Sequence, residues 1–343
     1  MHTVSLFGKK TTRTQISVFG KTDVGMTRDH NEDCFLVADM TARKASLLPE
    51  VRHHEVGPKG SLLMVADGMG GAAAGEVASE MATKAIYDHL MTSWISDKDD
   101  SPQQFAYRLR EAVENANAKI HAYAKEHPEN RGMGTTATTV GVLEDHVYLA
   151  QVGDSRAYLI RGGEATQLTK DQSLMQRLVD AGELTEEEAE HSERKNIILQ
   201  ALGPEGRVRV DLTYQKLNRG DTVLLCSDGL SGQVGKEDLA KAASQGKDLV
   251  EISGELIALA NERGGPDNIT VIVARFSGNN LQDPGGSESV GHEVYPLLDT
   301  GSTTEPVPLY KGNSPPTAQR SSMIAVGTAA AAIVAGALLL AIL

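Results

Sequence analysis

Residues 62–71 are Leu-Leu-Met-Val-Ala-Asp-Gly-Met-Gly-Gly, and this stretch decides how the chain is interpreted. Its apolar run predicts a buried strand that stops at Asp67 and Gly68. Asp-Gly alone is typical of a tight hairpin turn. Here two more glycines and a long helical pattern at 75–94 follow, so a two-residue hairpin is excluded. Asp67 is therefore expected at the rigid end of a strand, where a functional side chain is held in place.

Several other acidic residues also lie where an apolar run stops or begins. They are Asp154 after 146–152, Asp228 after 222–227, Asp267 before 269–273, and Glu32 and Asp33 beside the first turn region. Strand ends at one edge of a sheet can converge on a point, and carboxylates gathered there repel one another unless cations lie between them. Oxygen ligands of this kind, together with water, suit Mg²⁺ or Mn²⁺. Any single Asp-Gly is more simply a turn, so the prediction rests on the set.

The order of the predicted elements favours an α+β fold. Strand-like runs recur at 34–38, 61–66, 136–143, 146–152, 156–160, 222–226 and 269–276. Helical patterns come in pairs, at 75–94 with 102–126 and at 236–244 with 247–263. Ser101 and Pro102 are typical of a helix start. Because strands and helices do not alternate one to one, a layered sandwich is favoured over a doubly wound parallel sheet.

Composition excludes some classes of function. The 343 residues include 33 Lys and Arg against 46 Asp and Glu, which gives a formal net charge of −13. A nucleic-acid partner is not expected, because phosphate binding along a nucleic acid needs a basic face. The two cysteines, Cys34 and Cys226, cannot form a disulfide framework or a cysteine-rich zinc site. We interpret both as buried, inert thiols.

The sequence divides into four parts. Residues 1–15 are basic and polar and are expected to be disordered. Residues 16–276 have the pattern of a globular domain. Residues 277–322 are rich in Gly, Ser, Pro, Thr and acids and predict a flexible linker. Residues 323–343 carry no charge and are long enough to span a bilayer as a helix, at about 1.5 Å per residue, although a buried core helix is the alternative.

The apolar tail also predicts a location. Lys311 and Arg320 precede it, so the positive-inside rule places the globular domain on the cytoplasmic side of the cell (inner) membrane, held by a single span. The small residues at the ends of 327–331 and 332–336 have the spacing that pairs membrane helices and would allow a weak homodimer. An unpaired, alanine-rich anchor explains the same composition more simply.

Seven ordered motifs resemble the metal-dependent protein phosphatase family (PPM, type 2C), in its bacterial branch. They are TDVGMTR (22–28) with NED (31–33), VADGMGG (65–71), GMGTT (132–136), VGDSR (152–156), LTKD (168–171), SDGL (227–230) and GPDNIT (265–270). The match covers 16–276, which would be the phosphatase domain. It implies a four-layer α-β-β-α sandwich, with two antiparallel sheets flanked by helix pairs, followed here by the C-terminal transmembrane helix.

The resemblance also implies the chemistry. This is the metal-dependent hydrolysis of phosphoserine and phosphothreonine in proteins by a water between two Mn²⁺ or Mg²⁺ ions. Asp67 would bridge both ions, the Gly68 carbonyl would bind one of them, and Asp228 and Asp267 would bind the other. Glu32 and Asp33 would hold metal-bound waters, and Asp154 would help to bind a third, weaker ion. Arg28 would bind the substrate phosphate. The partners would be phosphorylated proteins, either substrates of an opposing serine/threonine kinase or that kinase itself.

Three positions depart from the family pattern. Ala72 and Met69 stand where relatives can carry a proton-donating histidine, so the general acid is unassigned, with metal-bound water and His30 as candidates. Gln172 stands where the family often has histidine, next to a flap at about 172–203, and this bears on substrate selection more than on chemistry. The alternative function is a catalytically impaired, membrane-tethered scaffold that binds phosphoproteins. A Rossmann-like nucleotide loop at 68–73 is disfavoured, because Asp67 would face a pyrophosphate.

Overall fold

The computed structural model describes residues 13–70, 74–243, 246–283, 285 and 289–297. The predicted transmembrane helix at 323–343 lies outside these residues, as do most of the predicted disordered segment at 1–15 and most of the predicted linker at 277–322. Among the residues that are described, no helix is both long and apolar enough to cross a membrane.

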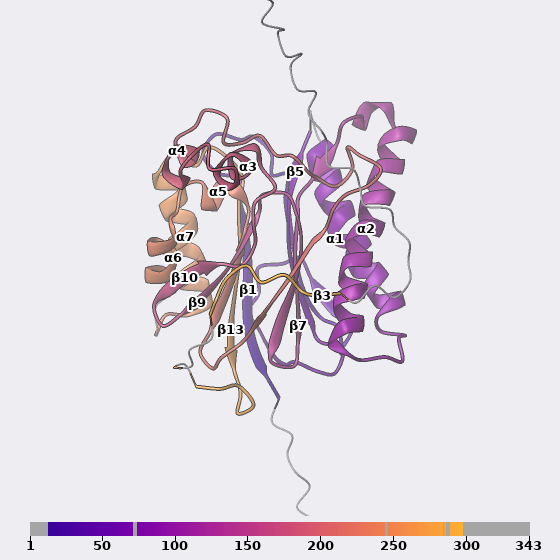
Figure 1. Ribbon diagram of the computed structural model, residues 1–343, viewed down its shortest axis with the longest axis vertical. Helices are drawn as coiled ribbons and strands as arrows, with labels where there is room; N and C mark the ends of the chain where they lie inside the picture. Colours follow the sequence, from indigo (N-terminus) through magenta and orange to yellow (C-terminus); the bar gives the residue numbers. More distant parts are fainter. Residues whose placement is uncertain (1–12, 71–73, 244–245, 284, 286–288, 298–343) are drawn as a thin grey trace, which may run out of the picture. The chain divides into compact units, whose positions relative to one another are not determined.

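Two antiparallel sheets pack face to face in the described domain (Figure 1). The first sheet has the order β11 (Asp211–Lys216), β8 (His146–Val152), β7 (Ala137–Leu143), β5 (Ser61–Met69), β2 (Asp33–Asp39) and β3 (Lys44–Ser46), with β6 (Gly134–Thr135) paired to the end of β5. The second has the order β10 (Glu164–Gln167), β9 (Arg156–Arg161), β12 (Thr222–Cys226), β13 (Ile269–Ser277), β1 (Gln15–Asp23) and β4 (Arg52–Glu55). The predicted α+β class is confirmed.

Strand β5 explains why its sequence is a continuous apolar run. Successive side chains of a strand point to opposite faces of the sheet. Leu62 and Met64 belong to the core between the first sheet and its helices, whereas Leu63 and Val65 belong to the core between the two sheets. A strand buried on both faces needs apolar residues at every position. The run ends at Asp67, where the strand reaches the end of the sandwich.

Helix pairs cover the outer faces of both sheets, as the sequence predicts (Figure 1). α1 (Ala74–Ser93) and α2 (Pro102–Glu126) pack on the first sheet, and α6 (Lys236–Ala242) and α7 (Leu249–Glu262) pack on the second. The predicted start of α2 is also correct, because the Ser101 hydroxyl accepts a hydrogen bond from the Gln104 amide at 3.2 Å. The other helices of the described residues follow strands or lie in loops. They are the 3₁₀ turn Pro128–Asn130, α3 (Leu174–Asp180), α4 (Glu186–Glu190) and α5 (Asp228–Ser231).

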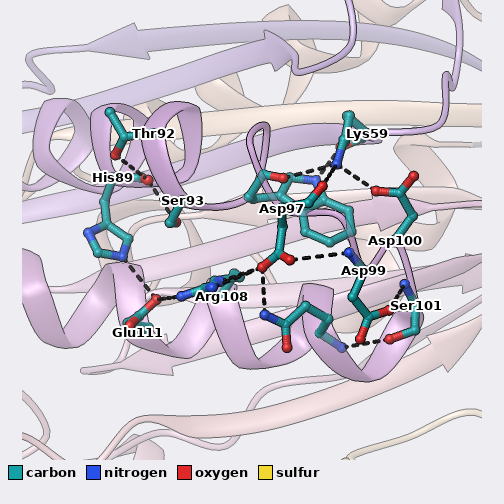
Figure 2. Close-up of polar contacts among 12 residues, drawn as sticks. Lys59, His89, Thr92, Ser93, Asp97, Asp99, Asp100, Ser101, Arg108 and Glu111 are labelled. Atoms are coloured by element: carbon teal, nitrogen blue, oxygen red, sulfur yellow. Dashed lines mark hydrogen bonds and ion pairs between the residues drawn. The ribbon is translucent and has the colours of Figure 1, made fainter.

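A polar network fixes the turn between α1 and α2 to the first sheet (Figure 2). Lys59, which lies just before β5, donates from Nζ to the carbonyl oxygens of Trp94 and Asp97, at 3.0 Å each. Its ammonium group also lies 4.5 Å from the centre of the Trp94 ring. Arg108 of α2 then binds the Asp97 carboxylate at 2.9 Å. This network lies at the end of β5 opposite to Asp67, so it anchors the helix pair rather than taking part in the acidic cluster.

The chain after β13 differs from the predicted flexible linker where it is described. Leu281 is buried, and the Arg219 amide donates to the Gln282 carbonyl at 2.7 Å. Further on, Tyr295 donates its amide to Leu212 of β11 at 2.9 Å, and its ring packs edge-on against Tyr148. Tyr295 and Leu297 lie against the core beneath the first sheet's helices. We call residues 289–297 the edge segment, because it extends the first sheet beyond β11.

We expect the edge segment to contribute measurably to stability. A chain that ends at residue 276 should have a free energy of unfolding lower by about 3 kcal/mol than a chain that ends at 297, because it loses the buried Leu281 side chain and the Tyr295 packing. Urea unfolding followed by circular dichroism measures the difference. Tyr295→Ala in the longer chain should lose part of this stability, and equal unfolding midpoints for the two truncated chains would contradict the expectation.

Candidate metal centre

Strand pairing brings the predicted acidic residues to one end of the sandwich. Asp33, the first residue of β2, pairs directly with Asp67 near the end of β5. Asp228 begins α5 after β12. Asp267 lies just before β13, the neighbour of β12, and is separated from β13 by Asn268. Asp154 lies in the turn between β8 and β9. We call these five residues the carboxylate cluster.

The backbone around Asp67 is held rigidly. The Asp67 amide donates to the Thr136 hydroxyl at 2.9 Å, and the Thr136 amide donates back to the Asp67 carbonyl at 2.9 Å. At Gly68, any Cβ atom would collide with the carbonyl oxygens of Gly75 and Glu32. Only glycine therefore allows the start of α1 and the loop before β2 to approach β5 this closely.

The carboxylates of the cluster disfavour one another's charge. Burial, followed by the charges of Asp33, Asp228 and the other cluster members, raises the pKa of Asp67 well above its usual range. Burial also raises the pKa of Asp33 to about 8, although a hydrogen bond from the Ser227 hydroxyl at 2.7 Å opposes the shift. Burial and the Asp228 charge raise the pKa of Asp154 to about 7. A cluster of this kind binds protons in place of a compensating cation.

The residues present fit divalent metal ions. Asp33 Oδ1 and Asp228 Oδ1 are buried acceptors without a hydrogen-bond partner in the described structure, and a cation would satisfy both. Among the described residues, no three or more His, Cys, Asp or Glu side chains are arranged closely enough to hold a metal ion as they stand. Asp33 is bonded to Ser227 and Asp267 to Arg28, so some of the side chains must turn from these pairings to enclose an ion. Carboxylate oxygens with one backbone carbonyl are the donors that Mg²⁺ and Mn²⁺ prefer.

Arg28 lies beside the carboxylate cluster and is partly exposed. Its Nη2 donates to Asp267 Oδ2 at 2.8 Å, and about half of its side chain is exposed, with a relative accessibility of 49%. Asp267 uses one of the five N–H donors of the guanidinium. The remaining donors make this group suitable for binding phosphate oxygens beside the carboxylates.

Asn268 organises this site, although its role is not predicted from the sequence. Its Oδ1 accepts from the Glu32 amide at 2.8 Å, and its Nδ2 donates to the carbonyl oxygens of Val24 and His30 at 2.9 Å each. One buried side chain therefore shapes the loop between β1 and β2 that carries Arg28. Its position directly after Asp267 was the sequence feature that could have pointed to this role. Its hydrogen-bond partners lie more than 230 residues away in the sequence, so the sequence alone does not identify them.

Gln172 has a structural role at the base of the flap. Its Oε1 accepts from the Gly153 amide at 3.0 Å, and its Nε2 donates to Asp211 Oδ2 at 2.9 Å. It is buried, and it fixes the turn that carries Asp154. Nearby, Arg156 forms a bidentate ion pair with Asp171, at 2.7–3.0 Å. The structure therefore connects Gln172 to the position of Asp154 rather than to substrate directly.

The structure places the remaining predicted residues around the cluster. Glu32 is partly buried beside the start of α1, where its carboxylate accepts from the Gly75 amide, and burial raises its pKa. Met69 is the last residue of β5, and His30 is exposed. Ala72 lies outside the described residues. No general acid is assigned by this arrangement.

A pocket of about 600 Å³ opens beside the cluster. Its lining includes Arg28, Asp154, Asp228 and Asp267. The flap forms one wall, and the segment from α5 to the start of α6 forms another. A phosphorylated group in this pocket would lie next to both the carboxylates and the guanidinium of Arg28.

Divalent metal should stabilise the protein more strongly at high pH. In the metal-free protein folding raises the pKa of Asp33 to about 8 and that of Asp154 to about 7. The folded state therefore loses stability as pH rises from the ordinary carboxyl range up to these values. A bound cation removes this penalty. The melting temperature with Mn²⁺ should therefore exceed that with chelator, and the gap should widen from pH 6 to pH 9, as scanning fluorimetry would show. In Asp154→Asn the melting-temperature difference between Mn²⁺ and chelator should depend less on pH. A difference that does not depend on pH in the unchanged protein would contradict this electrostatic explanation.

Comparisons with known proteins agree with this geometry. A family model described as Protein phosphatase 2C matches residues 51–266. The serine/threonine phosphatase stp of Listeria innocua is 36% identical over 275 residues, which are 78% of this chain and 98% of that protein. The crystal structure of the Mycobacterium tuberculosis serine/threonine phosphatase PstP has a TM-score of 0.64 and 38% identity, covering 77% of this chain and 99% of that one. A second structure, the catalytic domain of PstP in complex with two manganese ions, has a TM-score of 0.62 at 37% identity, with 77% and 99% covered. The chain therefore belongs to the protein phosphatase 2C family and is a protein serine/threonine phosphatase.

Proposed function

We propose that the carboxylate cluster binds two Mn²⁺ or Mg²⁺ ions, with a third, weaker ion, and that phosphoserine and phosphothreonine of proteins are hydrolysed there. The observation that carries this proposal is the buried cluster itself. In the described structure Asp33 and Asp228 each have a buried oxygen without a hydrogen-bond partner, and Asp228 lines the same pocket as Arg28. Two such ions, when bound, lower the pKa of a water between them and supply a nucleophile at neutral pH.

The positions of the residues suggest how each would act on the ions. Asp67 lies at the centre of the cluster and would bridge both ions, and the Gly68 carbonyl would bind one of them. Asp228, which follows β12, and Asp267, which precedes the neighbouring β13, would bind the other. Glu32 and Asp33 would hold water around the ions, and Asp154, at the edge toward the pocket, would hold the third.

Arg28 would orient the substrate. Its guanidinium, which now binds Asp267, would turn its donors to the phosphate oxygens and hold the phosphorus toward the cluster. Asp267 would then be free to act as a metal ligand. The proton for the departing serine or threonine oxygen has no assigned side chain. Water around the ions or His30 would supply it.

Phosphate release from a phosphothreonine peptide tests this function. We expect turnover by the full chain with Mn²⁺, none with chelator, and a loss of at least about a thousandfold in Asp67→Ala, because one bridging carboxylate serves both ions. Lys125→Ala, on the exposed face of α2, is the matched control and should keep full activity.

Absence of turnover from folded, Mn²⁺-loaded protein would contradict the proposal. That result would favour the alternative of a phosphoprotein-binding scaffold. Turnover that persists in Asp67→Ala would instead locate the metal chemistry elsewhere.

Asn268→Ala should impair catalysis without unfolding the domain. The change removes three hydrogen bonds that shape the loop carrying Arg28. We expect kcat/KM for the phosphopeptide to fall by about 10- to 100-fold, the size typical of losing residues that orient metal or substrate ligands. Asn268→Asp keeps the acceptor for Glu32 and should lose less. Equal kinetics for Asn268→Ala and the unchanged protein would show that the loop does not need Asn268.

We also propose that residues 323–343 anchor the enzyme in the cell membrane, with the phosphatase domain in the cytoplasm opposing a serine/threonine kinase. The support is the uncharged stretch itself and the preceding Lys311 and Arg320. A tether would concentrate the enzyme near membrane-bound phosphoproteins. A weak homodimer through this segment belongs to the same proposal.

Removal of residues 323–343 tests the anchor. The full chain should sediment with membranes, whereas the chain that ends at 322 should stay in the supernatant with the same activity per molecule. Sedimentation of both chains, or loss of activity in the shorter one, would contradict a simple tether.

A further inference from the structure

The pocket beside the carboxylate cluster is larger than a phosphorylated side chain needs. Its volume of about 600 Å³ lies within the range of about 300–1,000 Å³ that buries a drug-sized ligand. Met175 and Val179 of α3 give the flap wall an apolar part, and Gln176 and Asn196 add polar groups. The extra space can hold residues next to the phosphorylated one. The lining therefore has a direct effect on which phosphoproteins fit.

Two lysines from different parts of the chain line this pocket. Lys195 lies in the flap, and Lys236 is the first residue of α6. Both side chains are exposed, and in the described part of the chain neither forms a hydrogen bond or an ion pair. Arg156, which also lines the pocket, is by contrast already neutralised by Asp171. The two lysines are thus the cations available to a peptide away from the metal centre.

Most of the opposing charge of the lining lies in the carboxylate cluster and in Asp171, which is paired with Arg156. Apart from Asp171 and the carboxylate cluster, Glu186 is the acidic residue among the lining residues described. Metal ions at the cluster would compensate the charge of its carboxylates. The remaining charges of the lining would then be the positive charges of Arg28 and the two lysines and the negative charge of Glu186. This local excess of positive charge lies in a protein of net charge −13, which repels acidic molecules elsewhere.

We propose that Lys195 and Lys236 determine specificity, by selecting phosphoproteins with acidic residues next to the phosphoserine or phosphothreonine. The inference rests on the proposed function, because the same pocket must hold the phosphate. The ammonium groups of the flap lysine and of the lysine that begins α6 attract acidic residues next to the phosphorylated one. Glu186 limits the preference, so its removal should strengthen it.

Paired phosphothreonine peptides test the selection. The two peptides differ only in having Asp or Asn at the two positions on each side of the phosphothreonine. With Mn²⁺-loaded full chain, kcat/KM should be higher for the Asp peptide. Lys195→Gln and Lys236→Gln should each lower this ratio by about threefold, mainly through KM, as expected for one partly solvated charge pair. Glu186→Gln should raise the ratio, and Lys125→Gln, far from the pocket, should not change it.

The outcomes distinguish the selection of acidic peptides from the phosphatase function itself. Turnover of both peptides with a ratio near one, or with a ratio that neither lysine variant lowers, would overturn the selection while leaving the phosphatase function intact. A fall of equal size in Lys125→Gln would show a general charge effect and would also overturn it. Absence of turnover for either peptide would overturn the proposed function and the selection with it.

Discussion

The repulsion between buried carboxylates is the constraint on which the rest of the structure depends. Asp33, Asp67, Asp154 and Asp228 each have a raised pKa, with burial as the first cause and mutual charge contributing in every case. Folding alone gains nothing from gathering such groups, since burial of unpaired charge costs free energy. The sandwich must therefore be stable enough to hold them together. Three apolar cores, one between the sheets and one under each helix pair, provide that stability.

The fold turns this constraint into a site because of where the strands end. The direct pairing of Asp33 with Asp67, and the adjacency of β12 and β13, fix most of the cluster through backbone hydrogen bonds. Polar side chains then complete the positions that the sheets leave open. Asn268 shapes the Arg28 loop, Ser227 holds Asp33, and Gln172 fixes the turn before Asp154. These neighbours are uncharged, so they position the carboxylates without adding to the charge that a metal ion must compensate.

Much of this arrangement could be predicted from the sequence. Continuous apolar runs that end in Asp-Gly predict buried strands with acids at their ends, and the paired helical patterns predict the outer layers. The roles of Asn268 and Gln172 could not be predicted, because their hydrogen-bond partners are set by the tertiary arrangement of distant segments. The edge segment at 289–297 was missed for a different reason. Its surroundings have the composition of a linker, and only the open edge of β11 gives Tyr295 and Leu297 a place to pack.

Diffraction from crystals grown with Mn²⁺, recorded at the manganese absorption edge, tests the central claim most directly. The claim is that the buried carboxylates exist to hold metal. It predicts two strong anomalous peaks, one on each side of the Asp67 carboxylate, with Asp228 and Asp267 turned toward one of them. A well-ordered cluster without an anomalous peak, or with manganese bound only at other surface carboxylates, would contradict the account.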